Sequence, residues 1–113
     1  MSHPRNRVDG IIHQPVRFSI VALLAAVERA EFGFVRDRVE ISDSLLSRSV
    51  ATLEHAGYVR VEKGYVGKHP RTWLALTPEG RAAFDAHVAA LRAIIAAGDT
   101  PVHEPSRATA ERR

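Results

Sequence analysis

Apolar residues recur every three or four positions in two stretches of the chain, one toward each end. In residues 14–30 they are Val16, Ile20, Leu23, Leu24 and Val27. This spacing predicts an amphipathic helix, and Pro15 suits its first turn. In residues 78–97 a second stripe consists of Phe84, Val88, Leu91 and Ile95. Because Thr77, Pro78 and Glu79 form a typical helix start, we expect a long helix there that runs to about Ala97.

Between these helices, capping residues divide the chain into shorter elements. A short helix is expected over residues 35–39, after a brief extended piece at residues 32–34. Ser42 suits the N-cap of a following helix, and Asp43 suits the positive end of its dipole. Gly57 suits a left-handed C-cap. The pattern therefore predicts two helices joined by a short turn, with the second helix between Ser42 and Gly57.

Apolar and polar residues alternate after this helix. Residues 58–63 and 71–76 each place two apolar side chains on one face, which are Val59 and Val61 in the first run and Leu74 and Leu76 in the second. The intervening residues 64–70 are rich in Gly and Pro. This pattern predicts a β-hairpin with a long turn. Trp73 would point away from the inward leucines, and would pack either beneath the hairpin or against a partner subunit, with stacking on a ligand as the alternative.

The order of these elements is more specific than any one of them. Two helices joined by a short turn and followed by a β-hairpin are typical of a winged helix-turn-helix. The predicted fold is α+β and mostly α: a helix, a short helix, a recognition helix, a β-hairpin wing and a long C-terminal helix. We expect one domain over residues 10–97. Residues 1–9 and 98–113 are polar and lack periodicity, which predicts a flexible N-terminal arm and a disordered tail.

The predicted recognition helix has an unusual outer face. It carries few of the Glu and Lys residues that usually coat a solvated face, and instead presents Ser44, Ser47, Arg48, Ala51 and His55. Small side chains let a helix enter the DNA major groove, which is about 12 Å wide, and Arg can form two hydrogen bonds with guanine. A merely solvated face is the alternative, but the neighbouring basic hairpin favours DNA. The predicted base contacts are Ser44, Leu45, Ser47 and Arg48, with Leu45 against a thymine methyl group.

Positive charge is concentrated in the hairpin and in the N-terminal arm. The chain has a net charge of +3, and residues 58–73 hold four Lys or Arg residues against a single Glu. Such a cluster suits an anionic polymer, although a hairpin tip can also be charged only for solubility. The predicted contacts of the DNA backbone and the wing are Ser42, Thr52, Lys63, Lys68, His69, Arg71 and Thr72.

Composition excludes several other classes of protein. The 113 residues include no Cys, which excludes a disulfide framework, a zinc ribbon and thiol-based sensing. His13 and His87 are expected to meet at a dimer interface as polar residues, with a metal site there as the alternative. No nucleophile–base arrangement or phosphate-binding loop indicates an enzyme, and no cofactor or metal is expected. With no signal peptide and no apolar run of membrane-spanning length, the expected location is the cytoplasm.

The sequence also resembles a known family. The segments Ser42–Arg48, Leu53–Val59 and Glu62–Gly64, together with residues 70–84 (PRTWLALTPEGRAAF) and 12–17 (IHQPVR), are similar to short bacterial winged-helix regulators related to the MarR and ArsR groups. The resemblance covers about residues 8–95, and residues 53–59 and 70–84 are its most specific parts. It implies a dimeric, nucleoid-associated bacterial regulator that reads DNA with the helix near Ser42 and with the wing. It also implies dimer contacts from the first and last helices.

The stripe on the last helix favours the same dimer. Its apolar residues recur at gaps of four, three and four, close to a coiled-coil seam, and the stripe is wider than one small core can cover. Packing on its counterpart or on the partner's first helix is predicted, while covering only its own domain is the alternative. The predicted interface residues are Ile20, Leu24, Phe84, Val88, Leu91, Ile94 and Ile95.

Together these features predict a homodimeric transcriptional regulator that binds double-stranded DNA sequence-specifically. We expect it to act as a repressor on a pseudo-palindromic operator. The alternative is a winged-helix module that binds another protein and does not read DNA. The sequence identifies no small-molecule effector.

Overall fold

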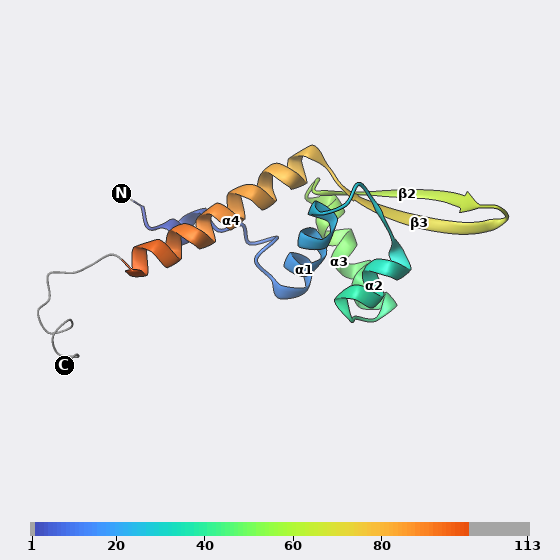
Figure 1. The fold of residues 1–113 in the computed structure, drawn as a ribbon, viewed down its shortest axis with the longest axis horizontal. Coiled ribbons are helices and arrows are strands. Elements are labelled where there is room, and N and C mark those ends of the chain that lie inside the picture. The colour runs from blue at the N-terminus through green and yellow to red at the C-terminus, as the bar shows by residue number, and fades with distance from the viewer. Residues whose placement is uncertain (1, 100–113) are drawn as a thin grey trace, which may run out of the picture.

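A computed structural model describes residues 2–99 of the chain (Figure 1). Its elements in chain order are η1 (Pro4–Arg7), α1 (Pro15–Ala25), β1 (Ala30–Glu31), α2 (Phe32–Val39), α3 (Asp43–His55), β2 (Val59–Val66), β3 (His69–Leu76) and α4 (Pro78–Asp99). The helix, the short helix, the recognition helix, the hairpin and the long final helix follow in the predicted order. The predicted winged helix-turn-helix is therefore confirmed.

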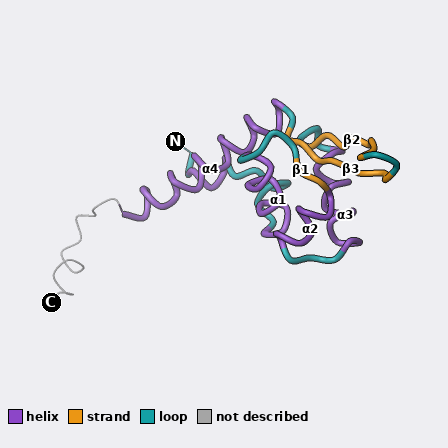
Figure 2. Tube along the Cα trace, turned by 45° about the vertical axis from the view of Figure 1, so that its right-hand side comes forward, coloured by secondary structure: helices purple, strands orange, loops and turns teal. Residues whose placement is uncertain are grey.

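The hydrophobic core lies where α1, α2 and α3 meet the inner end of the sheet (Figure 2). Every one of these helices and every strand contributes a buried side chain to a single cluster, which contains Ile20, Val21, Leu24, Ala30, Val35, Leu46, Val50, Leu53, Val59 and Leu74. Burial of apolar surface is the main force that stabilises such a cluster. The same core therefore sets the position of α3 relative to the wing.

The three strands form an antiparallel sheet in the order β1-β3-β2. β2 and β3 stay paired as far as Val66 and His69, so the long turn predicted at residues 64–70 is wrong. Pro70 is tolerated within β3 because the short β1 pairs only nearer the core, which leaves β3 with one neighbour at Pro70. The turn has two residues, and Gly67 adopts a φ of 64° there, a conformation that favours glycine.

The boundaries of two helices also differ from the prediction. α1 ends at Ala25 instead of Ala30, and the carbonyl of Ala25 accepts a hydrogen bond from the Arg81 side chain of α4 (3.1 Å). Ala30 is paired with β3 as part of β1. Val27, predicted on the buried stripe, is 38% exposed because it lies beyond the helix. Residues 32–34, predicted as extended, form the first turn of α2, since the extended piece comes two residues earlier.

The N-terminal arm, which is predicted to be flexible, instead lies along α4 (Figures 1 and 2). The Asp9 carboxylate accepts hydrogen bonds from the backbone N–H groups of Ile11 and Ile12 (2.8 and 3.3 Å) and from the Tyr58 hydroxyl (2.7 Å). Ile12 is fully buried. The residues before α1 are therefore part of the folded domain. At the other end, α4 extends through residues 98 and 99, and the rest of the predicted tail lies outside the described residues.

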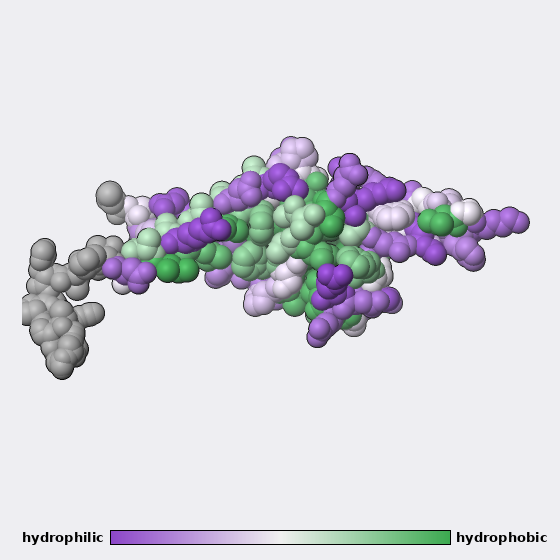
Figure 3. Space-filling model, in the orientation of Figure 1, coloured by the Kyte–Doolittle hydropathy of each residue, from purple (hydrophilic) through white to green (hydrophobic). Residues whose placement is uncertain are grey.

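The surface of the domain is uneven in polarity. In the space-filling view, hydrophobic residues gather over the middle of the molecule and along α4, whereas hydrophilic residues dominate the wing (Figure 3). Within residues 2–99, no helix has the length and apolar character needed to span a membrane.

Candidate nucleic-acid interface

The recognition helix α3 separates a buried face from a polar one. Its buried side chains are Leu46, Ser49, Val50 and Leu53. Its exposed side chains include the whole predicted outer face, which consists of Ser44, Ser47, Arg48, Ala51 and His55. The predicted division of the helix into two faces is therefore confirmed. Among the described residues, the Arg48 guanidinium has no hydrogen-bond or acidic partner, so it is available to an external acceptor.

The flanking positions of α3 are less open. Leu45 and Thr52 are half-buried, and the Thr52 hydroxyl donates a hydrogen bond to the Arg48 carbonyl (3.2 Å). The Ser42 hydroxyl caps the helix by accepting the Leu45 N–H (3.1 Å), and it lies 3.3 Å from the Ser44 hydroxyl. Ser42 therefore already has a structural role as the predicted N-cap.

The Asp43 carboxylate at the start of α3 is paired with the Arg36 guanidinium of α2. The Arg36 guanidinium donates hydrogen bonds to Asp37 and to Asp43, both at 2.8 Å. These bonds raise the pKa of Arg36, and the bond from Arg36 lowers the pKa of Asp37. Asp43 thus keeps its favourable place at the helix N-terminus while its charge is balanced by a cation. Sequence reasoning missed Arg36, because nothing in the local pattern indicates that its side chain reaches Asp43.

The far end of α3 is joined to the start of α4. Gly57 adopts a φ of 84°, and the Tyr58 N–H bonds to the Leu53 carbonyl (2.9 Å), as in a left-handed helix cap. The Thr77 hydroxyl donates to the Gly57 carbonyl (2.6 Å) and accepts the Gly80 N–H (2.9 Å). Both predicted caps are therefore present, and one hydroxyl connects them.

One face of the wing is directed toward α3. Residues alternate between the two faces of a strand, so Val61, Lys63 and Tyr65 share a face with their cross-strand partners Leu74, Thr72 and Pro70. A cavity of about 340 Å³ confirms which face this is, because Val61, Lys63, Thr72 and Leu74 line it together with Ser47, Val50, Ala51 and Glu54 of α3 and with Phe32. Lys63 and Thr72, two of the predicted wing contacts, therefore lie beside the exposed face of α3.

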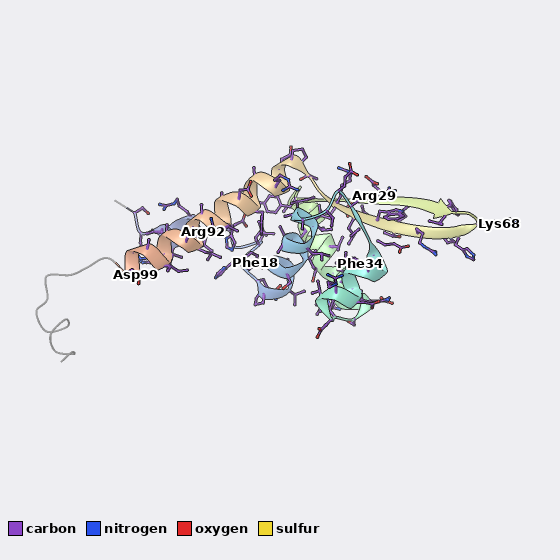
Figure 4. All side chains as sticks on the ribbon, viewed as in Figure 1. Phe18, Arg29, Phe34, Lys68, Arg92 and Asp99 are labelled. Carbon is purple, nitrogen blue, oxygen red and sulfur yellow. The ribbon has the colours of Figure 1, made fainter. Side chains whose placement is uncertain are left out.

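The opposite face of the wing carries ion pairs. Glu62 accepts hydrogen bonds from Arg60 (2.7 Å) and Arg29 (3.3 Å). Both cations lower the pKa of Glu62, and Arg60 has the larger effect. Arg29 also lies over the Trp73 ring, 4.1 Å from its centroid, beside the inner part of the wing (Figure 4). Trp73 therefore has a packing contact within its own chain.

These pairs change which cations of the wing are available. Arg71, a predicted DNA contact, forms a salt bridge with Glu31. Lys63 and Lys68 have no acidic partner within residues 2–99, and Lys68 lies at the very end of the wing (Figure 4). His69 is exposed next to it. Unpaired positive charge is therefore found beside α3 and at the tip, not evenly along the hairpin.

The predicted dimer residues fall into two groups. Ile20 and Leu24 are fully buried in the core of a single chain, so their assignment to a dimer interface is wrong. Phe84 is half-buried, with its ring centroid 6.1 Å from that of Phe18. The remaining residues lie along the outer half of α4, where Val88, Leu91 and Ile94 are half-buried and Ile95 is 65% exposed.

The two histidines expected at a dimer interface meet within one chain. His13 Nδ1 lies 3.4 Å from His87 Nε2, and His87 Nδ1 accepts the Asp9 N–H (3.1 Å). Since His87 Nδ1 is an acceptor, the proton of the neutral ring is on Nε2 and faces His13. Burial lowers the pKa of His87, and the nearby His13 lowers it further. No group of three or more potential metal ligands occurs among the described residues.

Comparison with known proteins agrees with this geometry. The model of a family described as a winged helix DNA-binding domain matches residues 16–95. The chain belongs to this family. The winged helix domain is also 30% identical over 78 residues to an uncharacterised protein of Methanocaldococcus jannaschii, a match that covers 69% of this chain and 85% of the relative.

Solved structures share the winged helix fold. A transcriptional regulator homologue from Pyrococcus horikoshii superposes with a TM-score of 0.80 at 24% identity, covering 88% of this chain and 100% of that one. A Mycobacterium tuberculosis transcriptional regulator in complex with DNA gives 0.61 at 23% identity, covering 85% and 68%. A MarR-family regulator from Silicibacter pomeroyi gives 0.61 at 23%, covering 95% and 71%. All three are described as transcriptional regulators or a homologue of one, and the likeness is one of fold.

Proposed function

We propose that this winged helix protein is a homodimeric transcriptional repressor that binds a pseudo-palindromic DNA operator. The observation that carries the proposal is the exposed face of α3, which has small polar side chains and an unpaired Arg48 and lies beside the unpaired Lys63 of the wing. A helix face of this kind fits the major groove, and a cation beside it fits the adjacent phosphates. Occupying an operator in this way would block access to the DNA beneath it.

The first two turns of α3 would read bases. Arg48 would form two hydrogen bonds with a guanine, while Ser44 and Ser47 would bond to base edges or phosphates. Leu45 is half-buried, so only its exposed part could contact a thymine methyl group. Lys63 and Thr72 would contact the backbone beside α3, and Lys68 and His69 would contact it from the tip. Arg71 would contribute less than predicted, because Glu31 already pairs with it.

The outer half of α4 would form the dimer interface. Its apolar residues remain partly exposed in a single chain, and exposed apolar surface of this kind marks an interaction site. Two-fold symmetry would then present two α3 helices to successive major grooves about 34 Å apart. Ile95→Asp is expected to shift the protein toward monomer in sedimentation velocity. Ala86→Asp, on the opposite side of the same helix and also exposed, is the matched control.

The decisive test compares specific and random DNA. After bound sequences are selected from a random duplex library, the affinities of wild type and Arg48→Ala are measured by fluorescence anisotropy. We expect Arg48→Ala to cost about 1–3 kcal/mol on the selected site, with relaxed base preference and little loss on random DNA. His55→Ala is the control, because His55 is exposed on the same face but lies in the last turn of α3.

Two results would contradict the proposal. An equal loss on selected and random DNA would show that Arg48 only contacts phosphate. If micromolar wild-type protein bound no duplex at low salt, the protein would not be a DNA-binding regulator, and the module that binds another protein would be favoured.

A further inference from the structure

The end of the wing exposes two large apolar residues next to each other. Tyr65 is 74% exposed and Val66 is 52% exposed, at the last two positions of β2. The tip lies well outside the hydrophobic core (Figure 1), and a hydrophobic spot is visible there among hydrophilic residues (Figure 3). Among residues 2–99, the Tyr65 hydroxyl has no hydrogen-bond partner. Both side chains therefore leave apolar surface in contact with water, which is unfavourable.

The charge around the tip indicates what covers this surface. No Asp or Glu occurs from Lys63 to Thr72, while Lys63 and Lys68 are unpaired in the described structure. A protein partner for such a tip would need an acidic surface, but DNA offers both phosphates for the lysines and sugars for the apolar side chains. Tyr65 also shares the α3-facing side of the wing with Lys63. A duplex bound to α3 would therefore pass along that side.

The length of the wing is comparable to the spacing of DNA grooves. Val61 lies beside α3, because it lines the cavity between the helix and the wing. From Val61 to Val66 the strand advances about 17 Å, and from Lys63, which lines the same cavity, it advances about 10 Å, at about 3.3 Å per residue. With about 34 Å per helical turn, the minor groove next to an occupied major groove is about 17 Å away along the axis. When α3 is in the major groove, a wing that follows the DNA axis would therefore bring its tip toward the adjacent minor groove.

We propose that Tyr65 and Val66 form an apolar wedge that packs into this minor groove. The proposal rests on the proposed function, because it requires α3 to bind DNA. Tyr65 would lie against the deoxyribose of one strand, with its hydroxyl able to donate to the adenine N3 or thymine O2 acceptors. Val66, on the other face of the hairpin, would contact the opposite wall. Other minor-groove binding proteins also place apolar side chains in this groove, where these side chains insert between base steps.

The wedge would give DNA binding two distinctive properties. Its contribution to affinity does not release counterions, so it is independent of salt, unlike the contribution of Lys68. It also favours A·T pairs about five positions from the centre of the half-site contacted by α3, because the guanine N2 amino group projects into the minor groove and blocks close packing.

The first experiment separates the apolar contribution from the charged one. Dissociation constants of the selected duplex are measured from low to moderate salt for wild type, Tyr65→Ala, Tyr65→Phe and Lys68→Ala. We expect Tyr65→Ala to weaken binding about tenfold at every salt concentration without changing the salt slope. Tyr65→Phe should keep most of the affinity. Lys68→Ala should reduce the slope of log K against log salt by about 0.9.

The second experiment tests the groove. Replacing flanking A·T pairs by G·C should weaken wild-type binding, and inosine·C pairs, which lack the N2 amino group, should restore it. Tyr65→Ala should not distinguish the three duplexes. If Tyr65→Ala binds the selected duplex as tightly as wild type at all salts, the wedge is wrong, while the DNA-binding function stands. If wild-type protein binds no duplex, both proposals fail together, so the two failures are distinguishable.

Discussion

Gly80, the third residue of α4, decides how closely this helix approaches the end of α3. A Cβ atom at this position would lie 2.1 Å from the Tyr58 carbonyl oxygen and 2.9 Å from Leu76 Cδ1. Nonbonded carbon atoms normally keep about 3.5 Å from their neighbours, so Gly80→Ala would force the two backbones apart by about 1 Å. The Tyr58 carbonyl also accepts the Thr77 N–H (3.0 Å), and that bond would be strained.

Two effects of Gly80→Ala oppose each other. Alanine is favoured over glycine inside a helix by about 1 kcal/mol. Overpacking a buried site costs about 1–3 kcal/mol or more, and here the obstructing atom belongs to the backbone and cannot rotate away. Loss of the hydrogen bond adds about 1 kcal/mol. The steric cost therefore wins, and we expect the free energy of unfolding to fall by about 3 kcal/mol.

Urea denaturation followed by the fluorescence of the single tryptophan measures this change. Gly98→Ala is the matched control, because Gly98 is in the same helix and a Cβ atom there would meet nothing within 4 Å. It should leave stability unchanged or raise it by up to about 1 kcal/mol. Gly80→Ala with wild-type stability would refute the reasoning, since it would mean that α4 can move away from Tyr58 without cost.

Three further predictions concern the cap, the buried histidine and the wing. Ser42→Ala removes the cap of α3 and should lower the free energy of unfolding by about 1 kcal/mol in urea denaturation. Since the folded-state pKa of His87 lies below its ordinary value of 6.5, wild-type stability should fall as the pH drops through 6.5 toward the folded pKa. His87→Asn, which keeps an acceptor for the Asp9 N–H, should flatten that pH dependence, and an unchanged slope would contradict the role of His87. Arg29→Ala should lower the free energy of unfolding by less than about 1 kcal/mol, because the Arg29–Glu62 pair is exposed, and it should alter Trp73 fluorescence. A larger loss of stability would mean that the cation–π contact stabilises the wing.

Features set by local chemistry were predictable from the sequence. The two faces of α3 follow from helical periodicity, and its ends follow from the capping preferences of Ser42 and Gly57. The inward side of each wing strand follows from alternation. These features depend on residues a few positions apart, so one stretch of sequence contains the information that determines them.

Features set by distant contacts were not predictable in the same way. Ala30 lies in a strand only because Leu74, far along the chain, pairs with it, and a two-residue strand has no periodicity of its own. Ile20 and Leu24 form part of an apolar stripe that fits a partner subunit as well as its own core, and only the packed structure distinguishes the two. The availability of each wing cation likewise depended on acids such as Glu31, which no local pattern connects to the wing.

The hydroxyl of Thr77 that joins the end of α3 to the start of α4 has a mechanical consequence. The junction has no slack, since the hydrogen bonds and the close approach at Gly80 hold the two helices at a set angle. α4 has 22 residues and is therefore about 33 Å long. Because its first turn is fixed to the end of the recognition helix, the two helices would rotate together, and α4 would act as a lever. Tilting this lever by about 10° displaces its far end by about 6 Å, a distance similar to one turn of α-helix. If two copies are joined through the outer half of α4, a small change in the crossing angle of the two α4 helices would change the distance between the two recognition helices. That distance would then no longer match the spacing of successive major grooves.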